Sequence, residues 1–368
     1  MSYDNSYRGL AGWVKAYIPR FRKGLLARKP LLFLNLAKAI VSKRLFNDGK
    51  VLSLDYGFSA ACNLKCRHCF STSFGTQSTT SEKPPLTTDQ MKTVVKKCVE
   101  AGIITFNFQG GEPLMDVDLL AELIKTCSPW NKYIQITTNG TLATEENLQF
   151  LKESGLDGVS ISIDSFSPEA HDEFRGVKGT FEKAMHCLEI AGKLGLTRTI
   201  CPVVSKNNAR DPDLVKLFNY ATERNIGVQP TIAMMVGNWR GKWEIMLGQD
   251  EINWLHQLYQ KNRLIRRDMY NNFTFPGCPA FKTLIYLTPK GEVTPCPFIH
   301  ISFGNLRELS LEEIVARARK LEFFRDPKAS PVCLAGEDRM FIEKYLVKTF
   351  GEDKVLPISC KEAFPEIY

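Results

Sequence analysis

From Val51 onward the sequence alternates short β-branched runs with helical segments, which is typical of successive βα units in a parallel sheet. We expect strands near residues 51–59, 103–108, 133–138, 157–163, 197–204 and 226–232. Helices should begin near Thr88, Val117, Glu145, Thr180 and Pro212. Six such units predict an α/β fold of the partial (β/α)6 barrel type. In parallel βα folds, ligands bind at the carboxyl ends of the strands.

The pattern divides the chain into four predicted parts. Residues 1–50 form a basic amphipathic helical segment, 51–233 the partial barrel, 234–276 a linker with one helix near 250–267, and 277–368 a second module. A hairpin signal in the second module, the Thr-Pro-Lys-Gly of residues 288–291, predicts two antiparallel strands. Two modules of these sizes can each bury a core.

The basic character of the chain belongs to its N-terminal segment. Residues 1–50 hold eleven Lys and Arg against two Asp, so the rest of the chain is close to neutral although the whole chain is +8. A basic amphipathic helix suits an anionic membrane surface, and the other interpretations are that the segment packs on the barrel or recruits an acidic protein partner. We expect no nucleic acid partner, because the segment lacks the aromatic platforms of common RNA-binding modules.

No apolar run reaches the ~18–20 residues needed to span a bilayer, and the first residues lack the pattern of a secretory signal. We therefore expect a cytoplasmic location, peripheral at the membrane if the basic segment binds there. Eleven cysteines in a reducing compartment point to metal ligation rather than to disulfides.

Three cysteines, Cys62, Cys66 and Cys69, follow directly on the first predicted strand. A structural zinc site uses four protein ligands. Three thiolates on a four-iron cluster instead leave one iron open to another ligand. Zinc with His68 as a fourth ligand is the alternative interpretation.

The spacing Cys-x3-Cys-x2-Cys, followed by Phe70, resembles the defining motif of the radical S-adenosylmethionine (SAM) superfamily. The resemblance implies that the three cysteines hold a [4Fe–4S] cluster whose fourth iron binds SAM, with Phe70 near the adenine. It implies cleavage of SAM to a 5′-deoxyadenosyl radical that abstracts hydrogen from a substrate carbon. It also implies a reducing electron donor of the flavodoxin or ferredoxin type.

Further family-like residues follow the next strands. The Gly-Gly-Glu sequence after the second strand resembles the family element that holds the SAM amino group, and polar residues after the later strands would contact its ribose and carboxylate. The predicted cofactor-binding residues are thus Phe70, Gly110, Gly111, Glu112, Asn139, Ser162 and Arg175. A glycine turn with a solvated Glu112, and a surface salt bridge for Arg175, are the alternatives.

A second set of cysteines lies in the C-terminal module: Cys278, Cys296, Cys333 and Cys360. The spacing of the first two around the hairpin glycine resembles the opening of the SPASM and twitch modules, with the small number of later cysteines favouring the shorter twitch type. The resemblance implies a second, auxiliary [4Fe–4S] cluster. If Cys360 does not bind it, one iron stays open for substrate. Buried free cysteine and a zinc site are the alternatives.

The remaining cysteines differ in their expected roles. Cys98, Cys127 and Cys187 fall on predicted helices and are interpreted as packing residues. Cys201 lies in the fifth predicted strand, where an inward thiol could donate a hydrogen atom to a radical; packing is the other interpretation.

No motif names a substrate. The basic N-terminal segment favours a lipid-linked or membrane-near substrate. The alternatives are an enzyme that modifies a peptide, or a small molecule such as an alcohol. A different class, a non-catalytic iron–sulfur or zinc-binding protein, also remains open at this point.

Overall fold

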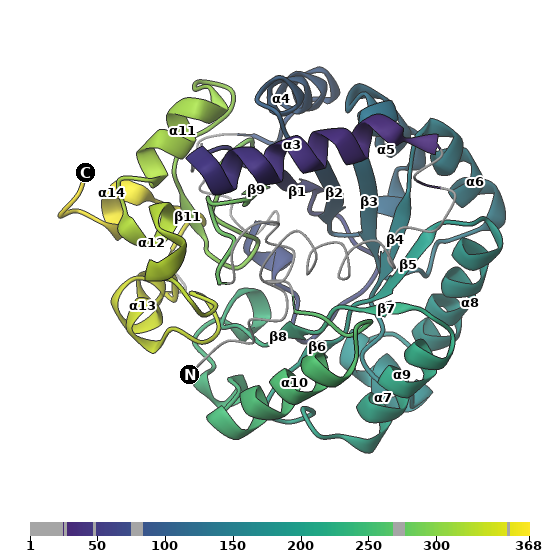
Figure 1. Cartoon of the computed structure of the whole chain (residues 1–368). Coiled ribbons are helices and arrows are strands. Elements are labelled where there is room, and N and C mark those ends of the chain that lie inside the picture. The colour runs from purple at the N-terminus through teal and green to yellow at the C-terminus, as the bar shows by residue number, and fades with distance from the viewer. Residues whose placement is uncertain (1–24, 26–27, 47–48, 75–83, 268–276, 352–353) are drawn as a thin grey trace.

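The fold was analysed in a computed structural model, which describes residues 25, 28–46, 49–74, 84–267, 277–351 and 354–368. The first 24 residues of the predicted basic amphipathic segment lie outside the described residues. Figure 1 shows a curved sheet with most of its helices on the outer side.

The strands are β1 (Ser53–Ser59), β2 (Thr105–Gly110), β3 (Tyr133–Thr138), β4 (Gly158–Ile161), β5 (Thr197–Ile200), β6 (Val203–Val204), β7 (Gly227–Val228), β8 (Thr231–Ile232), β9 (Leu284–Leu287), β10 (Val293–Thr294), β11 (Ile301–Ser302) and β12 (Ile358–Ser359). The helices are α3 (Pro30–Phe46), α4 (Thr88–Glu100), α5 (Val117–Thr126), α6 (Glu145–Ser154), α7 (Pro168–Arg175), α8 (Thr180–Lys193), α9 (Pro212–Glu223), α10 (Gln249–Lys261), α11 (Leu311–Ala318), α12 (Glu322–Arg325), α13 (Arg339–Lys344) and α14 (Cys360–Ala363).

The main sheet has eight strands in the order β10-β9-β1-β2-β3-β4-β5-β7. The five strands from β1 to β5 and the short β7 are parallel, as the βα pattern predicted. The extra strands come from the C-terminal module: β9 pairs parallel with β1, and β10 forms the predicted hairpin with β9. The α/β fold with a mostly parallel sheet is thereby confirmed.

Side chains alternate along the strands, so that apolar residues lie on the outer face of the sheet and polar residues on the inner face. Tyr56, Phe106 and Phe108 point outward into the core under the helices and are fully buried. The intervening residues, such as Asp55 and Asn107, line the inside of the barrel. The interior of the barrel is therefore built to hold a polar ligand rather than to pack.

Local capping explains where several helices begin. At α4, the Thr87 hydroxyl accepts a hydrogen bond from the Gln90 backbone N–H, and the Gln90 side chain accepts one from the Thr87 N–H. Sequence analysis missed α7, although Ser167 caps its start and Gly176 ends it in a left-handed conformation. It also placed the end of the linker helix too late: α10 ends at Lys261, and residues 264–266 run beside β7 instead.

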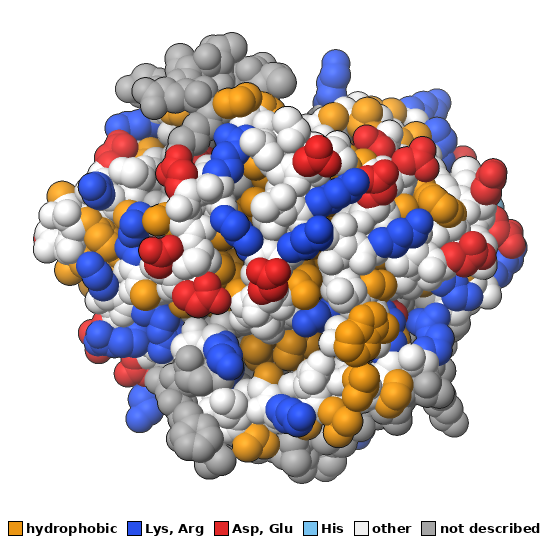
Figure 2. All heavy atoms as spheres, turned by 90° about the horizontal axis from the view of Figure 1, so that it is seen from above, with side chains coloured by type: hydrophobic (Ala, Val, Ile, Leu, Met, Phe, Trp, Pro, Cys, Tyr) orange, Lys and Arg blue, Asp and Glu red, His pale blue; other side chains and the backbone are white. Residues whose placement is uncertain are grey.

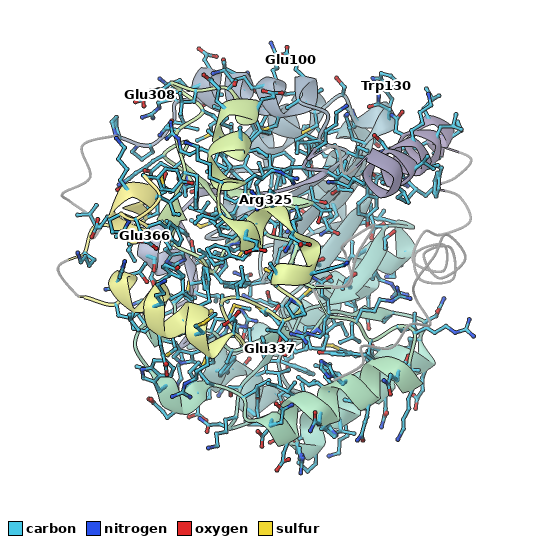
Figure 3. All side chains as sticks on the ribbon, turned by 60° about the vertical axis from the view of Figure 1, so that its left-hand side comes forward. Glu100, Trp130, Glu308, Arg325, Glu337 and Glu366 are labelled. Carbon is cyan, nitrogen blue, oxygen red and sulfur yellow. The ribbon has the colours of Figure 1, made fainter. Side chains whose placement is uncertain are left out.

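The linker and the C-terminal module together reach both edges of the partial barrel. At one edge β9 extends the sheet beyond β1. At the other edge the Val228 N–H donates to the Leu264 carbonyl and the Arg266 N–H donates to the Val228 carbonyl. Arg267 then forms a buried ion pair with Glu337, which precedes α13 and is labelled in Figure 3. The module thus spans the lateral opening between the two edges.

Helix α3 packs across the amino ends of the strands, where Leu52 and Ile104 precede β1 and β2. Just before α3, the Lys29 ammonium donates to the Lys132 carbonyl and pairs with the buried carboxylate of Asp157. Breaking such a buried pair by removing one partner costs about 3–5 kcal/mol. This cation of the basic segment therefore anchors α3 to the barrel instead of facing solvent.

Among the described residues, the longest apolar helices fall short of what crossing a bilayer requires.

Candidate functional site

Cys62, Cys66 and Cys69 lie in the loop after β1 and line one cavity of about 170 Å³. Nitrogen donors surround two of the sulfurs. The Leu64 N–H lies 3.4 Å and the Asn139 side-chain amide 3.9 Å from Cys62 Sγ, and the Arg175 guanidinium lies 3.9 Å from Cys66 Sγ. Such donors stabilise the thiolate form that metal binding requires.

Burial works against that thiolate when no metal is bound. It raises the pKa of Cys62 to about 11 and also raises the pKa of Cys66. The sulfurs of Cys62 and Cys66 would therefore be protonated thiols at neutral pH, and they become good ligands only when an iron replaces the proton. Three cysteines with N–H donors around one cavity suit an iron–sulfur cluster. Within the described ranges, no three His, Cys, Asp or Glu side chains converge on a single metal ion.

Two backbone hydrogen bonds fasten the cysteine loop to the end of β2. The Gly111 N–H donates to the Ser59 carbonyl at 2.8 Å, and the Glu112 N–H donates to the Ala61 carbonyl at 2.7 Å. A Cβ at Gly111 would lie 1.8 Å from the Ala61 carbonyl oxygen. This position therefore requires glycine because the two segments approach so closely.

A second clamp on the loop comes from a segment that sequence analysis did not single out. The Asn238 backbone N–H donates to the Cys69 carbonyl, and its side-chain amide donates to the Cys66 carbonyl at 2.8 Å. At Gly237 a Cβ would lie 1.9 Å from the Cys69 carbonyl oxygen. The Gly-Asn pair indicates a turn in the sequence. Its contact with the cysteine loop could not be predicted, because the pair lies far from the cysteines in the sequence.

The carboxylate of Glu112 is buried and already has protein partners. It accepts hydrogen bonds from the Thr138 hydroxyl at 2.6 Å, the Asn139 N–H at 2.8 Å and the Leu114 N–H at 2.9 Å. Burial raises its pKa. The alternative of a solvated Glu112 is wrong, since its side chain joins the ends of β2 and β3. Glu112 itself does not line the cavity at the cysteine loop, whereas the backbone of Gly110 and Gly111 does.

Arg175 also turns inward. It is 7% exposed and lines the cavity, and its Nε donates to Asp164 Oδ2 at 2.6 Å. The guanidinium and the Val203 N–H hold the pKa of Asp164 below its usual value. The surface salt bridge considered for Arg175 is therefore wrong.

The other predicted SAM contacts lie around the same space. Asn139 and Ser162 line the cavity at the ends of β3 and β4. Phe70 also lines it and meets Phe298 of the C-terminal module edge to face, with ring centroids 5.5 Å apart. All of the predicted cofactor-binding residues thus lie in or directly behind one cavity wall.

A second cavity, of about 230 Å³, occupies the inside of the barrel. Cys278, Cys296 and Cys333 line it together with the inward residues of β1 to β5. Burial raises the pKa of Cys296 and of Cys333, and each of these two thiols lies within electrostatic range of Cys278. The structure therefore brings three of the four C-terminal cysteines together.

Cys360 lies elsewhere. It begins α14, and its electrostatic neighbours are Arg317 and Tyr368 rather than the other cysteines. It does not line the barrel cavity. The sequence spacing between Cys333 and Cys360 does not predict that the two cysteines lie apart. The intervening chain folds into α13, and only the folded structure shows where it leaves Cys360.

The two cavities share part of their walls. The residues that line both are Gln109, Thr137, Cys201, Thr231, Met234 and Phe298. Gln109 is 8% exposed, and its amide nitrogen has no hydrogen-bond partner among the described residues. Sequence analysis missed it, although alternation along β2 places it on the same face as Asn107. The two cysteine sets thus line two adjoining cavities inside the barrel.

Comparisons with known proteins agree with this arrangement. Residues 56–218 match the Radical SAM superfamily, and residues 278–335 match SPASM, an iron–sulfur cluster-binding domain. The second match includes Cys278, Cys296 and Cys333 but ends before Cys360.

Curated relatives and solved structures are similar along most of the chain. An AdoMet-dependent heme synthase of Methanosarcina barkeri is 27% identical over 302 residues, which is 73% of this chain and 83% of that protein. A PqqA peptide cyclase of Rhizobium meliloti is 25% identical over 280 residues, or 72% and 73% of the two chains. The structure of native anSMEcpe with bound AdoMet has a TM-score of 0.58 at 21% identity, covering 85% of this chain and 96% of that one.

The fold, the cysteine loop after β1 and the domain matches define this chain as a radical SAM enzyme. Within that superfamily it belongs to the enzymes with a C-terminal SPASM domain. These domains imply a SAM-binding [4Fe–4S] cluster and auxiliary iron–sulfur binding. The predicted family, fold class and cofactors are thereby confirmed, and the non-catalytic alternative is set aside.

The close approach at Gly111 gives a direct test of how the cysteine loop is held. Replacing Gly111 with Ala should push the loop away from β2 and lower the iron bound per chain after anaerobic reconstitution by about half, because only the first cysteine set is affected. Gly227→Ala is the matched control, since a Cβ there meets nothing closer than 3.5 Å. Equal iron in the two variants would contradict the proposed constraint.

Proposed function

We propose that this enzyme binds SAM in the cavity at Cys62, Cys66 and Cys69, and abstracts a hydrogen atom from a substrate held in the adjoining barrel cavity. When bound, the cluster and SAM supply the 5′-deoxyadenosyl radical. The observation that carries the proposal is the shared wall, through Gln109, Thr137 and Cys201, between the two cavities. A radical formed in the cavity of the cysteine loop would need to move little to reach a substrate in the barrel cavity.

The residues around the first cavity have complementary chemistry for SAM. The guanidinium of Arg175 suits the carboxylate, and the carbonyls of Gly110 and Gly111 suit the amino group. Ser162 and Asn139 offer hydrogen bonds to the ribose, and Phe70 offers a face for the adenine. Glu112 would hold this wall in place through Thr138 and Asn139, and its predicted direct contact with the amino group stays a prediction.

For the auxiliary cluster we propose Cys278, Cys296 and Cys333 as ligands, with Cys360 outside the set. Three protein ligands would leave one iron free for a heteroatom of the substrate, on the wall of the cavity in which the substrate lies. The support is that these three cysteines line the barrel cavity and Cys360 does not. The enzyme would take its electrons from a flavodoxin- or ferredoxin-type donor.

The lining of the barrel cavity favours an uncharged polar substrate group at the reaction centre. Among the described residues that line it, the inward side chains are mainly Ser, Thr, Asn and Gln, and Asp55 is the one charged group. A peptide amide or an alcohol fits this lining, and the relatives include a heme synthase and a peptide cyclase. A lipid-linked substrate has no support from these relatives.

Formation of 5′-deoxyadenosine tests the proposed first site. After anaerobic reconstitution, SAM and dithionite should yield 5′-deoxyadenosine with the natural chain, while Cys66→Ala should lose it. Cys187→Ala, which changes a buried cysteine of α8, is the control. We expect about eight irons per natural chain, about four after Cys333→Ala with cleavage retained, and an unchanged number after Cys360→Ala.

Cleavage that survives Cys66→Ala would overturn the proposed first site. Loss of four irons after Cys360→Ala would instead show that Cys360 is a fourth auxiliary ligand.

We also propose Cys201 as a hydrogen-atom donor. Its thiol lines both cavities and therefore lies where a substrate radical would form. The S–H hydrogen atom would pass to the substrate carbon, leaving a thiyl radical that one electron from the reductant and one proton from solvent return to the thiol. The substrate would then gain a solvent-derived hydrogen without net oxidation.

Deuterium transfer can test Cys201 without a known substrate. In D2O the thiol carries deuterium, so uncoupled cleavage of SAM by dithionite, without added thiols, should give 5′-deoxyadenosine with one deuterium. Cys201→Ala and Cys201→Ser should lower that fraction at least several-fold, since a hydroxyl bond is too strong to react. Cys187→Ala should leave it unchanged. An equal deuterium content in all variants would exclude this role.

A further inference from the structure

Helix α3 carries apolar side chains on two opposite faces. Leu32, Leu36 and Ile40 point into the protein and are 0–1% exposed. Leu31, Leu34 and Val41 point the other way and are 46%, 55% and 50% exposed. A helix that is apolar all round is normally covered on both sides. The outer face of α3 therefore lacks a cover within the described structure.

An exposed tryptophan extends this face. Trp130 is 59% exposed and lies in a short 3-10 helix, residues 129–131, that packs beside α3. Figure 3 labels it next to the N-terminal part of α3, and Figure 2 shows hydrophobic side chains gathered in the lower right of the view. We call Leu31, Leu34, Val41 and Trp130 the α3 outer patch. Tryptophan is the side chain most typical of membrane–water interfaces.

The charges around the α3 outer patch are positive. Lys38 lies on the exposed side of the helix among the leucines, and the Arg28 side chain just before the helix is 44% exposed and pairs with the buried carboxylate of Asp157. The α3 sequence contains no Asp or Glu. Apolar side chains, a tryptophan and basic side chains beside them together match an anionic lipid surface.

The anchoring of α3 sets the orientation of such a contact. Lys29 and the inner leucines hold the helix flat against the amino ends of the strands, so it would lie in the interface rather than cross it. Leu36 of the inner face also lines the barrel cavity. One helix therefore separates the α3 outer patch from the cavity.

We propose that the α3 outer patch rests on an anionic membrane surface and places the amino end of the barrel against the bilayer. This inference does not depend on the proposed radical chemistry. It locates the enzyme beside the membrane and leaves the Cys62 loop, at the opposite end of the strands, facing the reductant in solution.

Co-sedimentation of the full chain with vesicles tests the proposal. We expect binding to phosphatidylcholine vesicles that contain phosphatidylglycerol, weaker binding at high salt, and little binding to phosphatidylcholine alone. The combined change Leu31→Gln, Leu34→Gln and Trp130→Gln should weaken binding at least tenfold. Met340→Gln is the matched control, because Met340 is 74% exposed on α13, away from α3.

Two controls separate this outcome from misfolding and from the proposed chemistry. Circular dichroism and 5′-deoxyadenosine formation should be the same in the triple variant and the natural chain, because all three side chains are exposed. Vesicle binding that is absent in the natural chain, or unchanged in the triple variant, would overturn the proposal. A dimer in size-exclusion chromatography that only the triple variant loses would assign the patch to a second copy instead.

Discussion

The parallel pairing of β9 with β1 is the constraint on which the arrangement of the site depends. β1 leads directly into the loop of Cys62, Cys66 and Cys69, and β9 lies between Cys278 and Cys296. A ladder that joins these two strands residue by residue fixes the distance and direction between the two cysteine sets. A shift of one residue would turn the inward side chains of β9 outward and move the second set off the cavity wall.

The opposite edge of the barrel completes that arrangement. Arg267 follows the segment that pairs with β7, and its partner Glu337 accepts a hydrogen bond from the Cys333 N–H at 3.0 Å. The Glu337 and Asp338 N–H groups donate back to the Cys333 carbonyl. The last cysteine of the triplet is therefore held from the far side of the barrel, so the C-terminal domain fixes its own cysteines by bridging the two sheet edges.

The sequence predicted those parts of the fold that depend on local signals. The alternation of β-branched runs with helical segments and the cysteine spacings located the strands, most helix starts of the barrel and both cysteine sets. Contacts between distant segments were not predictable in this way. The contacts of Gly237 and Asn238 with the cysteine loop, the β1–β9 pairing and the separation of Cys360 all depend on how the chain returns in space.

Glu112 was found as a site residue, but its partners Thr138 and Asn139 became visible only in the fold. The short helix α7 was missed although its cap residues were present, because eight residues give too little periodicity.

An anaerobic crystal structure with SAM, measured at the iron absorption edge, tests most directly the claim that two clusters lie on two adjoining cavities inside the barrel. The account predicts two iron peaks on opposite walls of the barrel interior, one at Cys62, Cys66 and Cys69 and one at Cys278, Cys296 and Cys333, with SAM on the first. A single iron peak, zinc in place of iron, or a second peak beside Cys360 and away from the cavity would contradict it.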